Sequence, residues 1–314
     1  MSELMCQQTR IDTVLPYFAA FMVDFPTVEA LASAPTERVL ERWSGLGYYS
    51  RARNLQKAAQ AVVAGGGFPR TIEGLRALPG VGPYTAGAIG SIAFGLDAPV
   101  VDGNVERVLA RLHAEPNPAK AWLWATAGEA LPLGEAGDYN QALMELGATV
   151  CLPRGPKCLV CPLRPACRGV GAPEQYPAAK VKKAVPRSRA VAAWIVREGR
   201  LLLARRPEGG LLGGLWELPG GVVEGGEPDG ASLRALLLQR IGAAIAAAET
   251  LGAVAHTFSH LHLDTTVFLA TLSGEGSPLG YPELRWVPLA DVDGMALSTL
   301  ARKTLVLGRR APSA

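Results

Sequence analysis

The chain has 314 residues and a formal net charge of +3, and 49% of its residues are hydrophobic while 19% are charged. This balance supports ordinary folded cores and excludes a disordered chain. The length predicts two domains, at about 150 residues each. No apolar run could span a membrane and no secretory signal opens the sequence, so we expect a cytoplasmic protein with no membrane partner. The small net charge by itself indicates no nucleic-acid partner.

Residues 1 to about 150 predict a helical domain. Apolar residues recur at three- and four-residue spacing between Val14 and Met22, as on one face of a helix. Proline and glycine mark helix ends, for example at 65–67 and 78–80. We find no alternation typical of strands here, so this part is expected to consist of short helices.

A linker is predicted over residues 169–189, where three prolines occur without a hydrophobic period. The stretch from 150 to 190 holds nine lysines and arginines and one acid, Glu174. Positive charge is thus concentrated where a phosphate backbone could use it. A solvated linker explains the lysines Lys180, Lys182 and Lys183 equally well.

From Ala190 the pattern changes to short apolar runs. Residues 191–196 and 200–204 flank a Glu198-Gly199 turn, which predicts a hairpin. A helix is expected over 232–242, and strands within 253–272 and 284–289. This half of the chain therefore predicts an α+β domain.

Four of the five cysteines fall within 17 residues, with the spacing C-x6-C-x2-C-x5-C, and Cys6 stands apart. In a reducing compartment such a cluster predicts a metal or iron–sulfur site rather than disulfides. Zinc ribbons pair two C-x2-C knuckles, and only one occurs here, so a [4Fe–4S] cluster fits the uneven spacing better. A structural staple and a loop that contacts phosphate are compatible roles. The expected ligands are Cys151, Cys158, Cys161 and Cys167.

The sequence Leu-Pro-Gly-Val-Gly at 78–82 lies between two helical stretches. Its glycines let backbone N–H groups converge at a helix N-terminus, which suits a DNA phosphate, although such a turn alone is more often structural. About twenty residues later, Asp102 precedes an apolar helical pattern, so capping is its default role.

Together these features resemble the helix-hairpin-helix DNA glycosylases of the endonuclease III type. Residues 3–9 and 45–53 are similar to the adenine DNA glycosylases (the MutY family), and the match extends over essentially the whole chain. The resemblance implies a multidomain protein: an all-α helix-hairpin-helix glycosylase with a [4Fe–4S] loop, and an α+β Nudix-like domain. We expect the glycosylase domain at 1–168, its cluster loop at 151–167, the basic linker at 169–189 and the Nudix-like domain at 190–311.

The resemblance implies a monofunctional glycosylase that hydrolyses the N-glycosidic bond of adenine mispaired with 8-oxoguanine or guanine in duplex DNA. Glu3 matches the family's general acid, and a carboxyl group in an apolar pocket can keep its proton near neutrality. Asp102 matches the carboxylate that stabilises the cationic sugar. Tyr84 and Asn104 match residues that position this chemistry, and Glu145 one that lines the adenine pocket. Lyase-type relatives carry a nucleophilic lysine where this chain has Tyr84, so no Schiff base is expected.

The resemblance also implies DNA contacts, made by a monomer on the nucleoid. Gln8 and Tyr48 match the wedge that enters the base stack. From the residue types alone, an exposed helix position for Glu3 and core packing for Tyr48 would be favoured. The further expected DNA-binding residues are Arg51, Pro79, Gly80, Val81 and Gly82.

Residues 221–227 fit the opening G-x5-E of the Nudix box. The positions where the box places its metal-binding acids read Leu236, Gln239 and Arg240. Mg²⁺ requires oxygen ligands, so diphosphate hydrolysis is not expected and the domain is interpreted as a Nudix fold retained for binding.

The sequence at 256–260 matches the loop with which the family recognises 8-oxoguanine. Ser259 can donate and accept hydrogen bonds at an oxidised purine, while Phe258 and His260 offer a stacking surface. The three histidines at 256, 260 and 262 also have a metal-like spacing, but no cysteine completes such a site, and polar strand-edge histidines are favoured.

In the family, one helix and half of the catalytic helix precede the acid, whereas only Met1 and Ser2 precede Glu3 here. Either the reading frame begins upstream or the chain is truncated. A truncated chain would be a non-catalytic DNA-damage binding protein, the alternative from a different class. Another helix-hairpin-helix glycosylase and a Nudix hydrolase are the enzyme alternatives.

Overall fold

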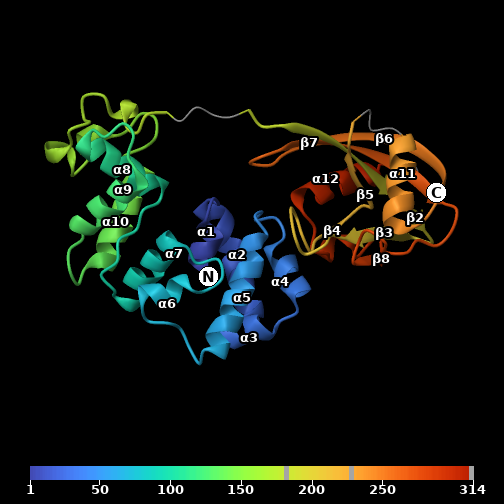
Figure 1. The fold of residues 1–314 in the computed structure, drawn as a ribbon, viewed down its shortest axis with the longest axis horizontal. Coiled ribbons are helices and arrows are strands. Elements are labelled where there is room, and N and C mark those ends of the chain that lie inside the picture. The colour runs from blue at the N-terminus through green and yellow to red at the C-terminus, as the bar shows by residue number, and fades with distance from the viewer. Residues whose placement is uncertain (180–183, 226–229, 311–314) are drawn as a thin grey trace. The chain divides into compact units, whose positions relative to one another are not determined.

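The computed structural model describes residues 1–179, 184–225 and 230–310 (Figure 1). The contacts divide the chain into two compact units. The first comprises 1–10, 27–32 and 54–182, and the second comprises 11–26, 33–53 and 183–314. The linker lysines Lys180, Lys182 and Lys183, and Glu227 of the predicted Nudix box, lie outside the described residues.

The described residues of the first unit form helices, turns and loops and include no strand, as the sequence predicts. It includes α1 (Ser2–Cys6), nearly all of α3 (Val28–Ser33) and most of α5 (Ser50–Ala64). Its other helices follow one another along the chain. They are α6 (Ile72–Arg76), α7 (Pro83–Ala88), the π-helical turn η1 (Ile89–Ala93), α8 (Gly103–His113), α9 (Lys120–Glu129), α10 (Ala136–Thr149) and the short 3₁₀ turns η2 (Cys158–Val160), η3 (Arg164–Ala166) and η4 (Pro173–Gln175).

The core of the first unit forms around α8. Its apolar residues Val105, Val108 and Leu109 are buried against α9 and α10, which gives the helix its inward face. Gly147 allows α10 to approach closely, because a Cβ at this position would lie 2.6 Å from the Cβ of Asn104. The packing of α10 thus fixes the N-terminal turn of α8, where the candidate catalytic residues lie.

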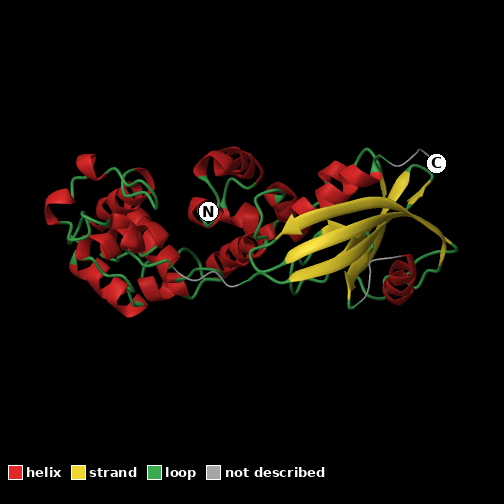
Figure 2. Ribbon diagram, turned by 90° about the horizontal axis from the view of Figure 1, so that it is seen from above, coloured by secondary structure: helices red, strands yellow, loops and turns green. Residues whose placement is uncertain are grey.

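The second unit contains two four-stranded sheets (Figure 2). The first has the order β5-β1-β7-β6, with β1 and β7 parallel and the other pairs antiparallel. In the second, β3 pairs with β2, β4 and β8. The strands are β1 (Arg187–Trp194), β2 (Val196–Arg197), β3 (Arg200–Arg205), β4 (Trp216–Glu217), β5 (Gly220–Val223), β6 (Ile245–Thr257), β7 (His262–Leu272) and β8 (Glu283–Pro288).

The helices α11 (Gly230–Ile241) and α12 (Thr299–Gly308) and the 3₁₀ turn η5 (Val292–Gly294) complete the Nudix-like part. The buried leucines Leu233 and Leu237 of α11 join the core of the first sheet. Strands β6 and β7 pair along their whole length and bring residues 258–261 to their connecting turn. The candidate recognition loop is therefore held at the end of a long two-stranded ladder.

Two N-terminal segments pack within the second unit. On α2 (Ile11–Asp24), Phe21 packs edge-on against Trp43 of α4 (Thr36–Trp43), at 6.1 Å between ring centroids. Hydrogen bonds then link this segment to the C-terminal part: Trp216 Nε1 donates to Glu37 at 2.9 Å, and the Tyr49 hydroxyl donates to the carbonyl of Leu297 at 2.8 Å. The boundaries proposed at 1–168, 169–189 and 190–311 remain a sequence prediction.

The predicted fold classes are confirmed, with differences in detail. The Glu198-Gly199 turn exists, with positive φ at both residues, but it joins only β2 to β3, while β1 belongs to the other sheet. Strand β6 begins eight residues earlier than predicted, because its alanine-rich start carries no alternation. In the described part of the chain no helix combines the length and apolarity that a membrane span requires.

Candidate active site

Two candidate catalytic side chains of the first unit form a direct pair. The Tyr84 hydroxyl on α7 donates to Oε2 of Glu3 on α1 at 3.2 Å, and lies 3.5 Å from the sulfur of Met144. Burial, followed by the charges of Glu3 and Asp102, raises the pKa of Tyr84 well above its ordinary value. Tyr84 therefore stays protonated and remains a donor toward the carboxylate at any physiological pH.

Asp102 is the N-cap of α8, as the sequence predicts. Its Oδ1 accepts from the backbone N–H groups of Asn104 and Val105 at 2.9 and 2.7 Å. Its Oδ2 accepts from the side-chain amide of Asn104 at 3.1 Å. Both carboxylate oxygens are thus oriented by α8. The backbone cap holds Oδ1, and the side chain of Asn104 holds Oδ2.

Arg107 connects this carboxylate to the cysteine loop. Its Nη2 donates to Oδ1 of Asn104 at 2.9 Å and to the carbonyl of Gly147 at 2.7 Å, and its Nε donates to the carbonyl of Cys151 at 2.7 Å. One planar guanidinium thus joins α8, α10 and the first cysteine. A continuous chain of hydrogen bonds runs from Asp102 through Asn104 and Arg107 to Cys151.

The predicted hairpin lies between α6 and α7. Gly80 has a φ of +76°, and a Cβ there would lie 2.5 Å from that of Asn54, so only glycine fits the turn. Gly82 is the N-cap of α7 and is followed by Pro83 at the first helical position. Gly80 and Gly82 are exposed, Pro79 is half-buried, and Val81 points into the small core with Leu75.

The four clustered cysteines surround one small cavity, which Arg111 of α8 also lines. Arg111 is only 3% exposed. It donates to the carbonyls of Leu152 and Pro153 at 2.7 and 3.1 Å and to the sulfur of Cys151 at 3.3 Å. Its own carbonyl accepts the backbone N–H of Gly169. Arg111 therefore holds both ends of the cysteine loop.

Burial raises the pKa of Cys167, the backbone N–H of Gly169 opposes this shift, and the three other cysteines add to it. In the described residues no three histidine, cysteine or acidic side chains form a group that could hold a single metal ion. A tetrahedral ion needs each sulfur about 2.3 Å from one point, whereas a four-iron cluster places its ligands around a larger body. Four thiols that line one cavity are a donor set of the kind that holds an iron–sulfur cluster.

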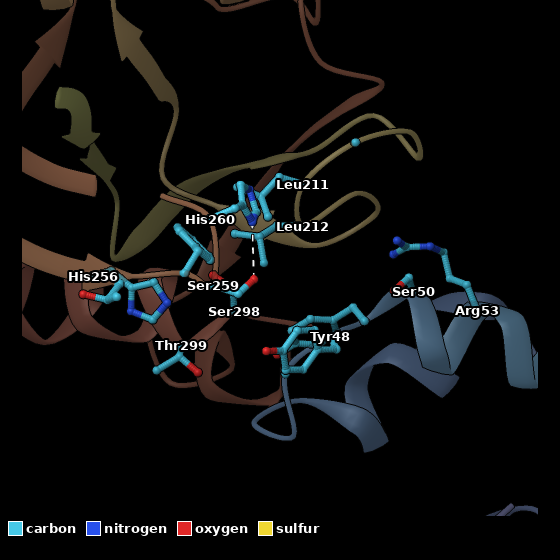
Figure 3. A pocket seen from close by; sticks show the side chains of 15 residues that line it. Tyr48, Ser50, Arg53, Leu211, Leu212, His256, Ser259, His260, Ser298 and Thr299 are labelled. Carbon is cyan, nitrogen blue, oxygen red and sulfur yellow. Dashed lines mark hydrogen bonds between the residues drawn. The ribbon is translucent and has the colours of Figure 1, made fainter. Parts of the chain in front are cut away.

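A second candidate site is a pocket of about 370 Å³ in the second unit (Figure 3). The loop before α5, the loop 210–212, the turn after β6 and the start of α12 line it, and its labelled side chains include Tyr48, Leu211, Ser259 and Thr299. The hydroxyl of Ser259 lies 3.4 Å from Nδ1 of His260. Phe258, Ser259 and His260, predicted from the sequence to recognise 8-oxoguanine, line this pocket together with Tyr48.

Residues that line this pocket also contact one another and the neighbouring loop. Arg53 of α5 donates to the carbonyl of Gly213 at 2.6 Å and thereby ties α5 to the glycine-rich loop. His256 packs edge-on against Phe258, with ring centroids 4.5 Å apart. Burial and the charge of Lys303 lower the pKa of His256, which keeps this imidazole neutral near pH 7.

The two expected wedge residues share an unusual backbone conformation. Gln8 and Tyr48 have φ values of +54° and +48°, in the left-handed region that residues other than glycine rarely adopt. Gln8 is exposed, and Tyr48 is 47% exposed. Such strained, exposed residues are typical of functional positions.

The remaining expected residues are placed differently. Arg51 is 8% exposed, and its guanidinium donates to the carbonyls of Leu46 and Gly47 beneath Tyr48. Glu145 is exposed on α10, where the neighbouring Met144 rather than Glu145 contacts Tyr84. The adenine-pocket role of Glu145 stays a sequence prediction.

Both halves of the chain match known protein families. Residues 1–123 match the HhH-GPD superfamily base excision DNA repair proteins, and residues 190–307 match the NUDIX domain. Adenine DNA glycosylase from Homo sapiens is 38% identical, and the alignment covers 96% of this chain and 66% of that protein. The enzyme of the same name from Rattus norvegicus is 38% identical, with 96% and 70% covered. This chain belongs to the adenine DNA glycosylase family.

The chain spans about two thirds of the length of these relatives. Among solved structures, a thermostable thymine-DNA glycosylase is similar with a TM-score of 0.50 and 31% identity, covering 54% of this chain and 81% of that one. The family members are DNA glycosylases that act on N-glycosyl bonds, and the helical fold is shared with this neighbour.

Sequence reasoning missed Arg107 and Arg111 as parts of this glycosylase site. Their acceptors are mostly backbone carbonyls about 40 residues away, which no residue type reveals. One signal was available: the two arginines are four residues apart, so they share a face of the helix that Asp102 caps.

We expect Arg107→Lys to lower the free energy of unfolding by about 1–3 kcal/mol, because lysine cannot replace the fork that serves three partly buried acceptors. Adenine release should slow as well, since Asn104 loses the partner that orients it toward Asp102. Thermal unfolding and single-turnover base release measure the two effects. Arg76→Lys, at an exposed arginine of α6 in the same unit, is the matched control. Equal melting and equal rates in both variants would contradict the bridging role.

Proposed function

We propose that this chain removes adenine mispaired with 8-oxoguanine or guanine by hydrolysing its N-glycosidic bond in duplex DNA. The observation that carries the proposal is the hydrogen bond from Tyr84 to Glu3, together with the charge of Asp102, which also raises the pKa of Tyr84. Two carboxyl groups that both act on one half-buried hydroxyl suit the chemistry of glycosidic bond cleavage. The chromosomal DNA of the cytoplasm is the proposed place of action.

In this proposal Glu3 is the general acid. The Tyr84 hydroxyl donates to Oε2 of Glu3 and leaves Oε1 to hold the proton, which passes to adenine N7 and makes the base a neutral leaving group. The target adenine must first leave the base stack, because its glycosidic bond cannot be reached inside a duplex.

Asp102 is proposed to stabilise the positive charge that develops on the sugar. Its carboxylate is held by two backbone N–H groups and by the Asn104 amide, so it needs no reorganisation when that charge forms. Tyr84 occupies the place of the lysine nucleophile of lyase-type relatives. We therefore propose base release that leaves an intact abasic site.

We expect Glu3→Gln to slow adenine release from an adenine:8-oxoguanine duplex by at least about 100-fold, since general acid catalysis contributes roughly 10²–10⁴-fold. Single-turnover release, followed by alkaline cleavage of the abasic site, measures this rate. The mismatched duplex should bind the variant as tightly as the unchanged chain. Equal rates would remove Glu3 from the mechanism.

The same assay decides between enzyme and binding protein. If the unchanged chain binds the mismatched duplex but releases no adenine, the proposed activity fails and a damage-binding role replaces it. Strand cleavage without alkali would instead indicate a lyase.

The pocket of the second unit is proposed to read the base opposite adenine. Ser259 presents a hydroxyl that can bond to the oxidised edge of 8-oxoguanine, beside the aromatic face of Phe258. Arg51 is proposed to support Tyr48 rather than to contact DNA itself. Its guanidinium carbon lies 5.5 Å from the ring centroid of Tyr48, and its Nη2 donates to the carbonyl of Gly47 in the turn before Tyr48.

We expect Ser259→Ala to lower the preference for 8-oxoguanine over guanine, because one hydrogen bond contributes about 1 kcal/mol, or roughly fivefold in rate. The ratio of adenine release rates from the two duplexes measures this preference. Ser273→Ala, at an exposed serine beyond β7, is the control that should leave the ratio unchanged. An unchanged ratio in Ser259→Ala would assign the discrimination to other residues of the pocket.

We further propose that Cys151, Cys158, Cys161 and Cys167 bind a [4Fe–4S] cluster. When bound, the cluster supplies a covalent staple for this loop and a centre whose potential the surrounding arginines tune. Arg111 and Arg107 tie the loop to α8 and so present its exposed basic residues, Arg154 among them, to phosphate.

Purified protein should contain four irons and four sulfides per chain if the cluster is present. We expect Cys161→Ser to lower the iron content, whereas Cys6→Ser, at the cysteine outside the loop, should keep it. Iron and acid-labile sulfide analysis measures both. One zinc per chain and no sulfide would contradict the proposal.

A further inference from the structure

A polar pocket lies at the Nudix-box positions of the second unit. Its cavity measures about 450 Å³. The loop after β3, the C-terminal turn of α11 and the segment before β8 line it. We call it the arginine pocket. Its lining includes Arg206, Gly210, Leu211, Gln239, Arg240 and Tyr281.

The charged lining of this pocket is entirely basic. Arg206 and Arg240 line it, and its described lining includes no acidic side chain. Glu217 lies behind the lining and accepts from Nη1 of Arg206 with both oxygens at 2.9 Å, and its charge also interacts with Arg240. Glu208 lies in the lining loop between Pro207 and Gly209, where it is exposed and its charge interacts with Arg53. Glu217 can offset only one of the two arginines, so the pair of arginines keeps a net positive charge.

Arg240 is seated by aromatic and backbone groups. Its guanidinium carbon lies 5.6 Å from the ring centroid of Tyr281, whose hydroxyl is fixed by hydrogen bonds to the backbone of Gly220. A Cβ at Gly221 would lie 3.0 Å from that carbon, so glycine leaves the space that the guanidinium fills. A side chain held in this way loses little further freedom when it binds a ligand.

Gln239 and Arg240 occupy positions where a Nudix box carries acids that bind a divalent cation. Such acids reach a diphosphate only through the cation. An arginine in the same place contacts phosphate oxygens directly, through a planar fork of donors. The substitution thus converts a cation site into an anion site on the same scaffold.

We propose that the arginine pocket binds the diphosphate group of a free nucleotide without Mg²⁺ and without hydrolysing it. A concave pocket of this volume suits a small ligand, whereas a duplex backbone requires an extended basic surface. This binding goes beyond the glycosylase activity and does not depend on it.

Calorimetric titration of the full chain with ADP and with inorganic pyrophosphate, in EDTA, tests the proposal. We expect saturable binding at one site, weakened by added salt. Arg240→Gln should weaken it at least about tenfold, because a charge-assisted contact is lost. Gln239→Glu, at an exposed position, should weaken it by repulsion. Arg234→Gln, at an exposed arginine of the same helix, should bind like the unchanged chain.

Three results would overturn the proposal: no binding of either probe, a requirement for Mg²⁺, or equal affinity in Arg240→Gln and Arg234→Gln. Should Arg240→Gln melt early, Gln239→Glu decides the matter, because its side chain lies outside the core. A duplex DNA arm separates the two sources of phosphate. If duplex DNA displaces pyrophosphate and Arg240→Gln weakens duplex binding, the pocket serves the DNA backbone and the free nucleotide is excluded.

Discussion

The geometry of the catalytic unit depends on one helix, α8. Its first turn is capped by Asp102, and one of its faces carries Arg107 and Arg111 four residues apart. These arginines donate to backbone carbonyls of the cysteine loop. The carboxylate proposed for catalysis and the loop proposed to hold a cluster are thus two ends of a single rigid element. A shift of either end must be transmitted through a helix that cannot easily bend.

The close approach of α10 adds to this rigidity. Gly147 brings its backbone carbonyl within reach of Arg107, and a side chain at that position would meet Asn104 instead. The donor Tyr84 is held differently, by burial on α7 beside Met144. Three short helices therefore contribute one group each to the Glu3, Tyr84 and Asp102 constellation. None of these groups requires a long flexible side chain to reach the others, and this is the condition for a preorganised site.

Much of this arrangement could be predicted from local patterns. The cysteine spacing, the glycine hairpin and the Asp102 cap are short-range signals. The structure gathers the four cysteines around one cavity, begins α7 directly after the hairpin and caps α8 with Asp102. Long-range partners were not predictable in the same way. The inward position of Arg51, the two loop-holding arginines and the packing of residues 33–53 in the second unit depend on carbonyls and surfaces distant in the chain. Strand β6 escaped prediction in its first half because alanine has no preference for the faces of a sheet.

One loop of the second unit has a consequence for binding. Gly210 and Leu211 line both the pocket proposed to read the opposite base and the arginine pocket. A ligand that ordered these two residues would change the free energy of filling the neighbouring cavity. Thermodynamic reciprocity then applies: whatever factor an anion imposes on recognition of the opposite base, that base imposes on the affinity for the anion. Damaged DNA and a soluble nucleotide would thereby affect each other's binding through Gly210 and Leu211, without direct contact between the two ligands.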